Sequence, residues 1–217
     1  MEEKEKNKRI KNVHYRQFLD KGIIKTIQER DIEIALNKVE YRHRREGRAL
    51  IICLYYTGAR PVEVLNIKAK HIKREKNYII IETPASKNGL PRSVYLPFKK
   101  PLVKELFRFA CGLMPERYMF WNFKGRYIRK VMTRKGVKEY IEETNRIKYY
   151  FQKWFSSLEG GAITPYHLRH NRFSKLAQSG ATMDELRVLK GAKTYASIMP
   201  YIHMSTAQAK KVARRID

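Results

Sequence analysis

Apolar residues recur at helical spacing from Thr26 onward, and this pattern predicts a series of helices in the first part of the chain. Residues 45–56 predict the second helix, whose segment 49–56 is hydrophobic nearly all round, as expected of a helix at the centre of a domain. Gly58 is placed as a glycine that ends a helix, and Pro61 is suited to begin the next one.

A segment with strand character follows these helices. Residues 78–82 are rich in β-branched side chains, and residues 92–96 are suited to pair with them. The Asn88-Gly89 pair between the two segments is typical of a hairpin turn, because both residues adopt a positive φ at low cost. We therefore expect Lys87 to project from the tip of a hairpin.

The second half of the chain is mostly helical in pattern. The predicted helices cover residues 102–110, 125–134, 136 to about 158, a segment from Thr164-Pro165 to Ser179-Gly180, 183–190 and 206–215. There is no internal repeat and no low-complexity segment. Together with the hairpin, the pattern predicts a mainly α fold with a small antiparallel β-sheet, in the α+β class.

Residues 1–25 carry many charges and only a weak apolar pattern. We therefore expect a flexible or partner-dependent N-terminal arm at residues 1–25, followed by one folded domain at residues 26–217. A length of 217 residues with a hydrophobic fraction of 43% is sufficient for one buried core.

The charge of the chain indicates what kind of partner it binds. Lys and Arg total 47 against 21 Asp and Glu, which gives a formal net charge of +26. A field of this sign attracts polyanions such as nucleic acids. The first 25 residues lack the apolar core of a signal peptide, and no run has the length of a membrane helix, so we expect a cytoplasmic protein with no membrane partner. Cys53 and Cys111 lie in apolar stretches without metal-type spacing, which predicts two reduced, packed thiols.

The candidate chemistry lies in a basic cluster and a downstream tyrosine. The cluster is Tyr166-His167-Leu168-Arg169-His170, and the tyrosine is Tyr201. A further arginine, Arg60, lies far upstream in Thr57-Gly58-Ala59-Arg60. A tyrosine hydroxyl needs help to attack a phosphodiester, and guanidinium groups can give it, because each is always charged and matches two phosphate oxygens at once.

These motifs, in this order, resemble the catalytic domain of the tyrosine recombinases, or phage integrase family. The resemblance covers about residues 26–203 and includes the segment 57–63, the hairpin with Lys87, the Leu168-Arg169-His170 motif and Tyr201. The aromatic and basic stretch 126–155 is most similar to the archaeal and archaeal-virus branch. The resemblance implies the tyrosine recombinase catalytic-domain fold over residues 26–217, without the N-terminal core-binding domain that such enzymes usually carry.

The resemblance also implies roles. Arg60 and Arg169 would bind the non-bridging oxygens of the scissile phosphate, and Glu63 would orient the Arg60 guanidinium. Tyr201 would be the nucleophile that forms a 3′-phosphotyrosyl link, so rejoining would need no ATP, metal or other cofactor. Lys87 would protonate the leaving 5′ oxygen as the general acid.

Two positions depart from the family pattern. Tyr166 stands where the family usually has a histidine; a tyrosine can donate a hydrogen bond to a phosphate oxygen but is a poor base at neutral pH. Ala192 stands where the family usually has His or Trp, and the adjacent Lys193 is a candidate donor to the phosphate in its place.

Several assignments have alternatives within the sequence. Lys99, Lys100 and Arg92 compete with Lys87 for its assignment, and Tyr195 competes with Tyr201. His167 and His170 are candidates for structural rather than catalytic roles.

The leading hypothesis is a site-specific recombinase or integrase that cleaves and rejoins duplex DNA and assembles as a homo-oligomer on it. The alternatives are a catalytically impaired DNA-binding relative, an enzyme that nicks and reseals DNA like a topoisomerase, and a basic RNA-associated protein. The substitutions at 166 and 192 favour the impaired relative, whereas the ordered set of motifs favours the recombinase.

Overall fold

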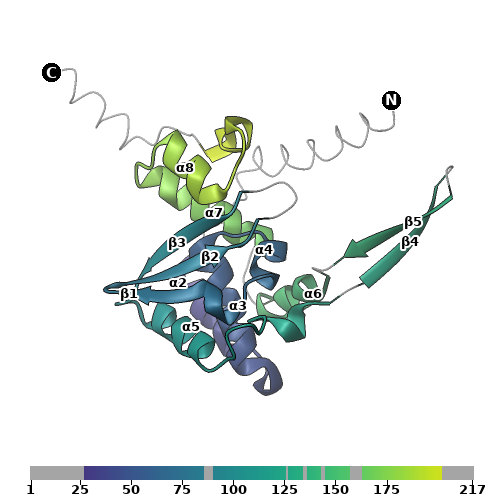
Figure 1. Cartoon of the computed structure of the whole chain (residues 1–217), viewed down its shortest axis with the longest axis horizontal. Helices are drawn as coiled ribbons and strands as arrows, with labels where there is room; N and C mark the ends of the chain where they lie inside the picture. The colour runs from purple at the N-terminus through teal and green to yellow at the C-terminus, as the bar shows by residue number, and fades with distance from the viewer. Residues whose placement is uncertain are drawn as a thin grey trace.

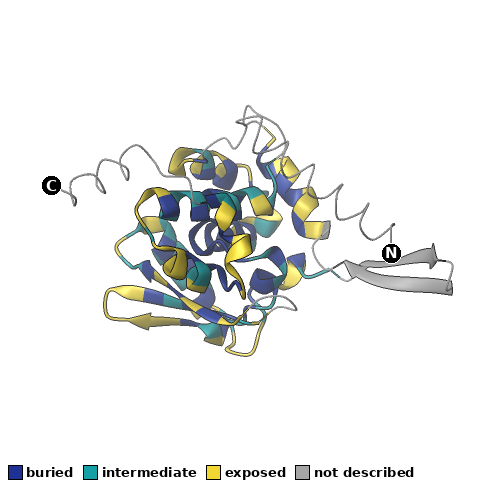
Figure 2. Cartoon of the chain, turned by 90° about the horizontal axis from the view of Figure 1, so that it is seen from above, coloured by how far each residue is buried: buried dark blue, intermediate teal, exposed yellow. Residues whose placement is uncertain are grey.

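The molecule is built around one central helix. The computed structural model describes residues 27–85, 90–125, 127–133, 136–142, 145–156 and 163–201. In the helix α3 (Arg44–Thr57), every residue from Ala49 to Thr57 is buried. Figure 2 shows this buried segment, in dark blue, at the centre of the folded molecule. The prediction of a central, all-round hydrophobic helix is therefore confirmed.

Of the remaining helices, all but the last lie around α3, and the last packs against the helix that precedes it (Figure 1). They are α2 (Glu29–Asn37), α4 (Pro61–Leu65), α5 (Pro101–Cys111), α6 (Asn145–Trp154), α7 (Pro165–Gln178) and α8 (Met183–Lys190). Short 3₁₀ turns lie between or after them, at η1 (Tyr41–His43), η2 (Ala69–His71), η3 (Trp121–Phe123), η4 (Tyr195–Ser197) and η5 (Met199–Tyr201). The helices expected at 45–56, 102–110 and 183–190 are confirmed within a residue or two. The predicted helix 206–215 and the arm 1–25 lie outside the described residues.

An antiparallel sheet packs beside the helices, with strands in the order β1 (Ile72–Glu75), β2 (Tyr78–Thr83) and β3 (Arg92–Pro97). In the β2–β3 pair Ile79 faces Leu96 and Ile81 faces Val94, and all four side chains are buried. This pair confirms the predicted strands. The edge strand β1 was not predicted, because three of its four residues are exposed and polar. The predicted turn at 88–89 lies outside the described residues.

The region after Gly125 corrects the sequence prediction. Instead of helices beginning at 125 and 136, the chain forms the antiparallel strands β4 (Tyr127–Thr133) and β5 (Gly136–Glu142), which project from the body in Figure 1. Of the helix predicted from 136 to about 158, the part over α6 is confirmed. β-Branched residues such as Ile128 and Val131 favour strands once a partner strand is present.

Two separate clusters of buried side chains hold the helices. The main core centres on α3 and includes aromatic residues of α6 such as Phe151 and Trp154. A second, smaller cluster lies at α7 and α8 and consists of Phe173, Ala177, Leu186, Ala192, Ile198 and Tyr201. Cys53 is buried in the main core as predicted, whereas Cys111 is exposed at the end of α5, so the prediction of two packed thiols is wrong for Cys111.

Candidate active site

Arg60 is held at the junction between α3 and α4. Gly58 ends α3 in the left-handed conformation, with a φ of 59°, and its N–H donates to the carbonyl of Leu54. Arg60 then precedes α4 as its N-cap residue with an extended backbone, and Pro61 begins the helix. The predicted glycine and proline signals therefore fix the position of Arg60 in the fold.

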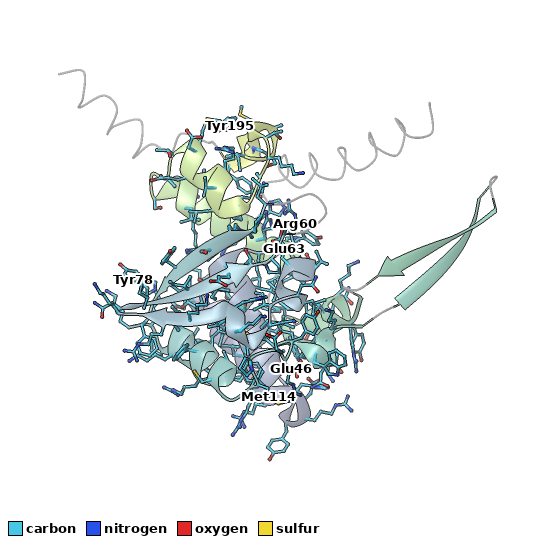
Figure 3. The ribbon with its side chains drawn as sticks, viewed as in Figure 1. Glu46, Arg60, Glu63, Tyr78, Met114 and Tyr195 are labelled. Atoms are coloured by element: carbon cyan, nitrogen blue, oxygen red, sulfur yellow. The ribbon has the colours of Figure 1, made fainter. Side chains whose placement is uncertain are left out.

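Glu63 is a buried carboxylate that two arginines share. Its Oε1 accepts from Nη1 of Arg60 at 2.6 Å, and its Oε2 accepts from the backbone N–H of Arg60 at 2.8 Å and from Nη2 of Arg92 at 3.0 Å. Burial acts to raise the pKa of Glu63, but the charge of Arg92 and the hydrogen bonds of Arg60 outweigh it and hold the pKa below its usual range. Glu63 thus orients Arg60, and Figure 3 shows the two side chains together.

Arg169 links this junction to the end of α8. Only 4% of Arg169 is exposed; its Nη1 donates to the carbonyl of Gly58, and its Nη2 donates to the carbonyl of Lys190 at 3.0 Å. Burial, followed by repulsion from Arg60, lowers the pKa of the Arg169 guanidinium to about 10, which leaves it charged at neutral pH. The structure therefore brings Arg60 and Arg169 into one site, as the sequence predicted.

Two further cations lie in the same site. The sequence analysis named Arg92 only as an alternative to Lys87 and gave no role to Lys190. Arg92 is buried at the start of β3, and among the contacts of the described residues its Nε and Nη1 have no hydrogen-bond acceptor. The side chain of Lys190 is buried too, and burial together with the charges of Arg169 and Arg60 lowers its pKa to about 7. Arg60 and Arg92 thus bind the carboxylate of Glu63, and Arg169 and Lys190 lie close enough to Arg60 for their charges to interact, an arrangement suited to binding an anion such as a phosphodiester.

The sequence did contain a signal for Arg92. The burial of β3 alternates, so that Arg92, Val94 and Leu96 share the inward face. A strand that alternates in this way places every second side chain in the core, whatever its charge. The burial of Lys190 has no such signal, because it depends on how α8 packs against α7.

Gly191 brings α8 and β3 close together. Its carbonyl accepts from the N–H of Leu90 at 3.1 Å, and its φ is 62°. A Cβ added at Gly191 would lie 2.8 Å from both Nη1 of Arg92 and the carbonyl oxygen of Leu90. The absence of a side chain at this position therefore permits the contact between β3 and α8.

We expect Gly191→Ala to lower the free energy of unfolding by about 2–4 kcal/mol, because the strained φ and the crowding against Arg92 and Leu90 add together. Urea denaturation measures this loss. Gly180→Ala is the matched control, since Gly180 also has a positive φ, of 93°, but an added Cβ would meet nothing within 4 Å. The control should lose only about 1–2 kcal/mol, and equal losses in the two variants would contradict the crowding.

Tyr201 lies in the small core next to these cations. It is 5% exposed, its ring lies 4.5 Å from Nζ of Lys190, and its hydroxyl makes a hydrogen bond of 2.7 Å with Nδ1 of His170. Lys190 also donates to the carbonyl of Ser197, which leads into η5. The alternative nucleophile, Tyr195, is 43% exposed, is bonded to Asp184 and lies at the outer end of this region in Figure 3. Of the two tyrosines, Tyr201 is the one in contact with the cationic site.

The other predicted residues lie as follows. Tyr166 is 46% exposed in the first turn of α7, and Lys193 is exposed just after α8, next to the buried Ala192. His167 has a capping role, since its Nδ1 accepts from the backbone N–H of Thr164 at 2.9 Å. Lys87 falls outside the described residues. The roles of Tyr166, Lys193 and Lys87 therefore stay predictions.

Among the described residues, no group of three or more His, Cys, Asp or Glu side chains is arranged to hold a metal ion. No helix in the described part of the chain is long and apolar enough to span a membrane.

The chain shares its fold and most of its length with known recombinases. The phage integrase family matches residues 25–208. The tyrosine recombinase XerA of Pyrococcus furiosus is 22% identical over 199 residues, which cover 92% of this chain and 64% of that protein. The crystal structure of the XerH site-specific recombinase bound to its difH substrate has a TM-score of 0.60 at 16% identity, covering 86% of this chain and 53% of that one. The structure of the Tn1549 transposon integrase in complex with circular intermediate DNA has a TM-score of 0.55 at 17% identity, and the match covers 89% of this chain and 67% of that one.

The family match covers most of the chain, and the mostly helical fold with its small antiparallel sheet is that of the solved recombinase structures. The chain therefore belongs to the phage integrase family, that of the tyrosine recombinases. It spans about three fifths of the length of XerA, the curated relative described above.

Proposed function

We propose that this protein is a site-specific DNA recombinase or integrase that cleaves and rejoins duplex DNA through a 3′-phosphotyrosyl intermediate at Tyr201. The observation that carries the proposal is the meeting of Arg60, Arg169 and Tyr201 around one buried cationic site. Two guanidiniums beside a tyrosine hydroxyl supply what a phosphoryl transfer needs, namely charge stabilisation of the phosphate and a positioned nucleophile.

The individual roles follow from this chemistry. Arg60 and Arg169 bind the non-bridging oxygens, Tyr201 attacks the phosphorus, and Lys87 protonates the leaving 5′ oxygen. Tyr166 and Lys193, both exposed, donate hydrogen bonds to the phosphate in place of the family's usual side chains. Because the phosphotyrosyl link keeps the energy of the broken bond, the reaction proceeds without ATP or a metal cofactor.

The proposal also includes the binding partner, the oligomeric assembly and the cellular location of the protein. The partner is duplex DNA carrying an attachment or recombination site, on which the protein assembles as a homo-oligomer in the cytoplasm. The net charge of +26 supports a polyanionic partner, and XerH and the Tn1549 integrase have been solved with DNA. The similarity to XerA of Pyrococcus furiosus supports the archaeal or archaeal-virus branch. Residues 26–217 serve as the catalytic domain, and residues 1–25 are the N-terminal arm predicted from the sequence.

One alternative has specific support. Tyr166 and Ala192 replace two side chains that the family usually uses, so the protein could bind DNA yet cleave it poorly. A second variant of the proposal is cleavage and resealing without strand exchange, as in a topoisomerase. The recombinase, the impaired DNA-binding relative and the topoisomerase-like variant are distinguished by whether a covalent adduct forms and whether supercoiled plasmid relaxes.

The test is adduct formation by the unaltered protein on nicked duplexes, from which the short cleaved fragment diffuses away and traps the intermediate. A pool of such duplexes of randomised sequence, labelled on the strand that becomes attached, is resolved on a denaturing gel. We expect labelled DNA to migrate with the protein, and an RNA duplex of the same length to give no adduct. Salt-dependent binding without any adduct would favour the impaired relative, and plasmid relaxation together with an adduct would favour the topoisomerase-like variant.

A further inference from the structure

The hydroxyl of Tyr201 and the imidazole of His170 form a directly bonded pair. Their Oη and Nδ1 atoms are 2.7 Å apart, and the two rings are tilted by 32° with centroids 5.7 Å apart. This distance is within the range over which a general base can take a proton. His170 follows Arg169 in α7, so the helix that carries a phosphate-binding guanidinium also carries the side chain bonded to the proposed nucleophile.

The other candidates for proton acceptor in this region are differently placed. Tyr166 is nearly half exposed in the first turn of α7. His167 has its Nδ1 occupied by the backbone N–H of Thr164, which stabilises the start of α7. Lys193 is exposed beyond α8. His170 is thus the histidine placed on the reacting oxygen.

The surroundings of His170 keep it neutral before reaction. Burial, then the charges of Lys190 in α8 and of His167 and Arg169 in α7, lower the pKa of His170 to about 4. A neutral imidazole that is protonated on Nε2 has a lone pair on Nδ1, which accepts the O–H of Tyr201. The same cations that disfavour the imidazolium attract the phosphate, and the bound phosphate offsets their repulsion when the proton moves.

We propose that His170 is the catalytic base of this reaction: its Nδ1 takes the proton of the Tyr201 hydroxyl as that oxygen attacks the phosphorus. The inference rests on the proposed function. As the Oη–P bond forms, the P–O5′ bond breaks, and the leaving oxygen receives a proton from the general acid or from water. In the rejoining step the 5′ hydroxyl gives its proton to the deprotonated general acid or to water as its oxygen forms the P–O5′ bond again. The P–Oη bond breaks, and His170 returns its proton to Tyr201.

Two substitutions separate proton transfer from positioning. His170→Asn retains a hydrogen-bond acceptor near the place of Nδ1 but cannot take a proton at neutral pH, whereas His170→Ala removes both functions. The rate of adduct formation on the nicked duplexes is measured from pH 6 to pH 9, with DNA binding and thermal unfolding measured beside it. We expect both variants to bind DNA like the unaltered protein and to react about 10²–10⁴-fold more slowly at pH 7.

The pH dependence is the decisive measurement. Without a base the hydroxyl must lose its proton to solvent hydroxide, so the rate of His170→Asn should rise steeply with pH, and its defect should shrink. A defect of the same size at every pH would indicate a structural role and overturn the proposal, as would a rate for His170→Asn within about threefold of the unaltered protein.

The matched control is His43→Gln. In a second described histidine–tyrosine pair, Nε2 of His43 lies 3.2 Å from the hydroxyl of Tyr150 in α6. This change removes an imidazole from a tyrosine hydroxyl outside the cationic site and should leave the rate and its pH dependence as in the unaltered protein. If the unaltered protein forms no adduct, the proposed function itself fails, which is a different outcome from a failure of His170.

Discussion

Replacing Tyr201 with phenylalanine is expected to abolish the covalent protein–DNA adduct completely while leaving DNA affinity within a few-fold of the unaltered protein. The change removes only the hydroxyl, which is the attacking atom, and keeps a ring that packs against Phe173 and beneath Lys190. DNA binding depends mainly on charge, which the substitution does not alter. Denaturing gels of the labelled nicked duplexes measure the adduct, and filter binding at several salt concentrations measures the affinity.

Tyr195→Phe is the control for this experiment. Tyr195 competes with Tyr201 in the sequence, but its hydroxyl is bonded to Asp184, and Arg187 lies over its ring at 5.3 Å. We expect Tyr195→Phe to form the adduct at close to the unaltered rate. An adduct that persists in Tyr201→Phe and disappears in Tyr195→Phe would reverse the assignment of the nucleophile.

Local sequence signals predicted much of the scaffold that holds the site. The all-round apolar run of α3, the glycine at 58 and the proline at 61 are properties of neighbouring residues, and they place Arg60 at a helix junction without knowledge of the fold. The start of α7 at Pro165 and the span of α8 follow from similar signals. The order of the motifs then indicated that Arg60, Arg169 and Tyr201 belong together.

The contacts and strands that the sequence did not predict depend on packing between segments far apart in the chain. Arg169 reaches the carbonyls of Gly58 and Lys190, so a single side chain ties α3 to the end of α8. The partner of Arg92 is Glu63, from a helix that precedes the whole sheet. The strands β4 and β5 are likewise defined by their pairing with each other, which the composition of either segment does not reveal.

These contacts form a closed ring that links the four cationic side chains. Glu63 binds Arg60 and Arg92, and the N–H of Leu90, near Arg92, donates to the carbonyl of Gly191. The guanidinium of Arg169 donates to the carbonyl of Lys190, which precedes Gly191, and to the carbonyl of Gly58, which lies close to Arg60 in the chain. Because the ring contains four cationic side chains, its stability depends strongly on the one carboxylate that both Arg60 and Arg92 share.

Glu63→Gln is therefore expected to lower the free energy of unfolding by about 3–5 kcal/mol, since it leaves the buried guanidinium of Arg92 and the partly buried one of Arg60 without their counter-charge. The same variant should form adduct far more slowly, because Arg60 loses the group that orients its guanidinium. Urea denaturation at pH 7 and the adduct assay measure the two effects. Glu116→Gln is the matched control, because Glu116 is also shared by two cations, Lys68 and Lys70, but at an exposed position where little stability is expected to be lost.

The effect of Glu63 on stability should also depend on pH in a defined direction. The folded protein holds the pKa of Glu63 below its usual range, so the stability that its charge contributes is fully present above about pH 4.3, the pKa of an unperturbed glutamate. That contribution is lost as the pH falls through the lower pKa of the folded state. The difference in free energy of unfolding between the unaltered protein and Glu63→Gln should therefore narrow below about pH 4. A difference that stays constant, or widens, as the protein is acidified would show that the carboxylate charge of Glu63 is not what stabilises the ring.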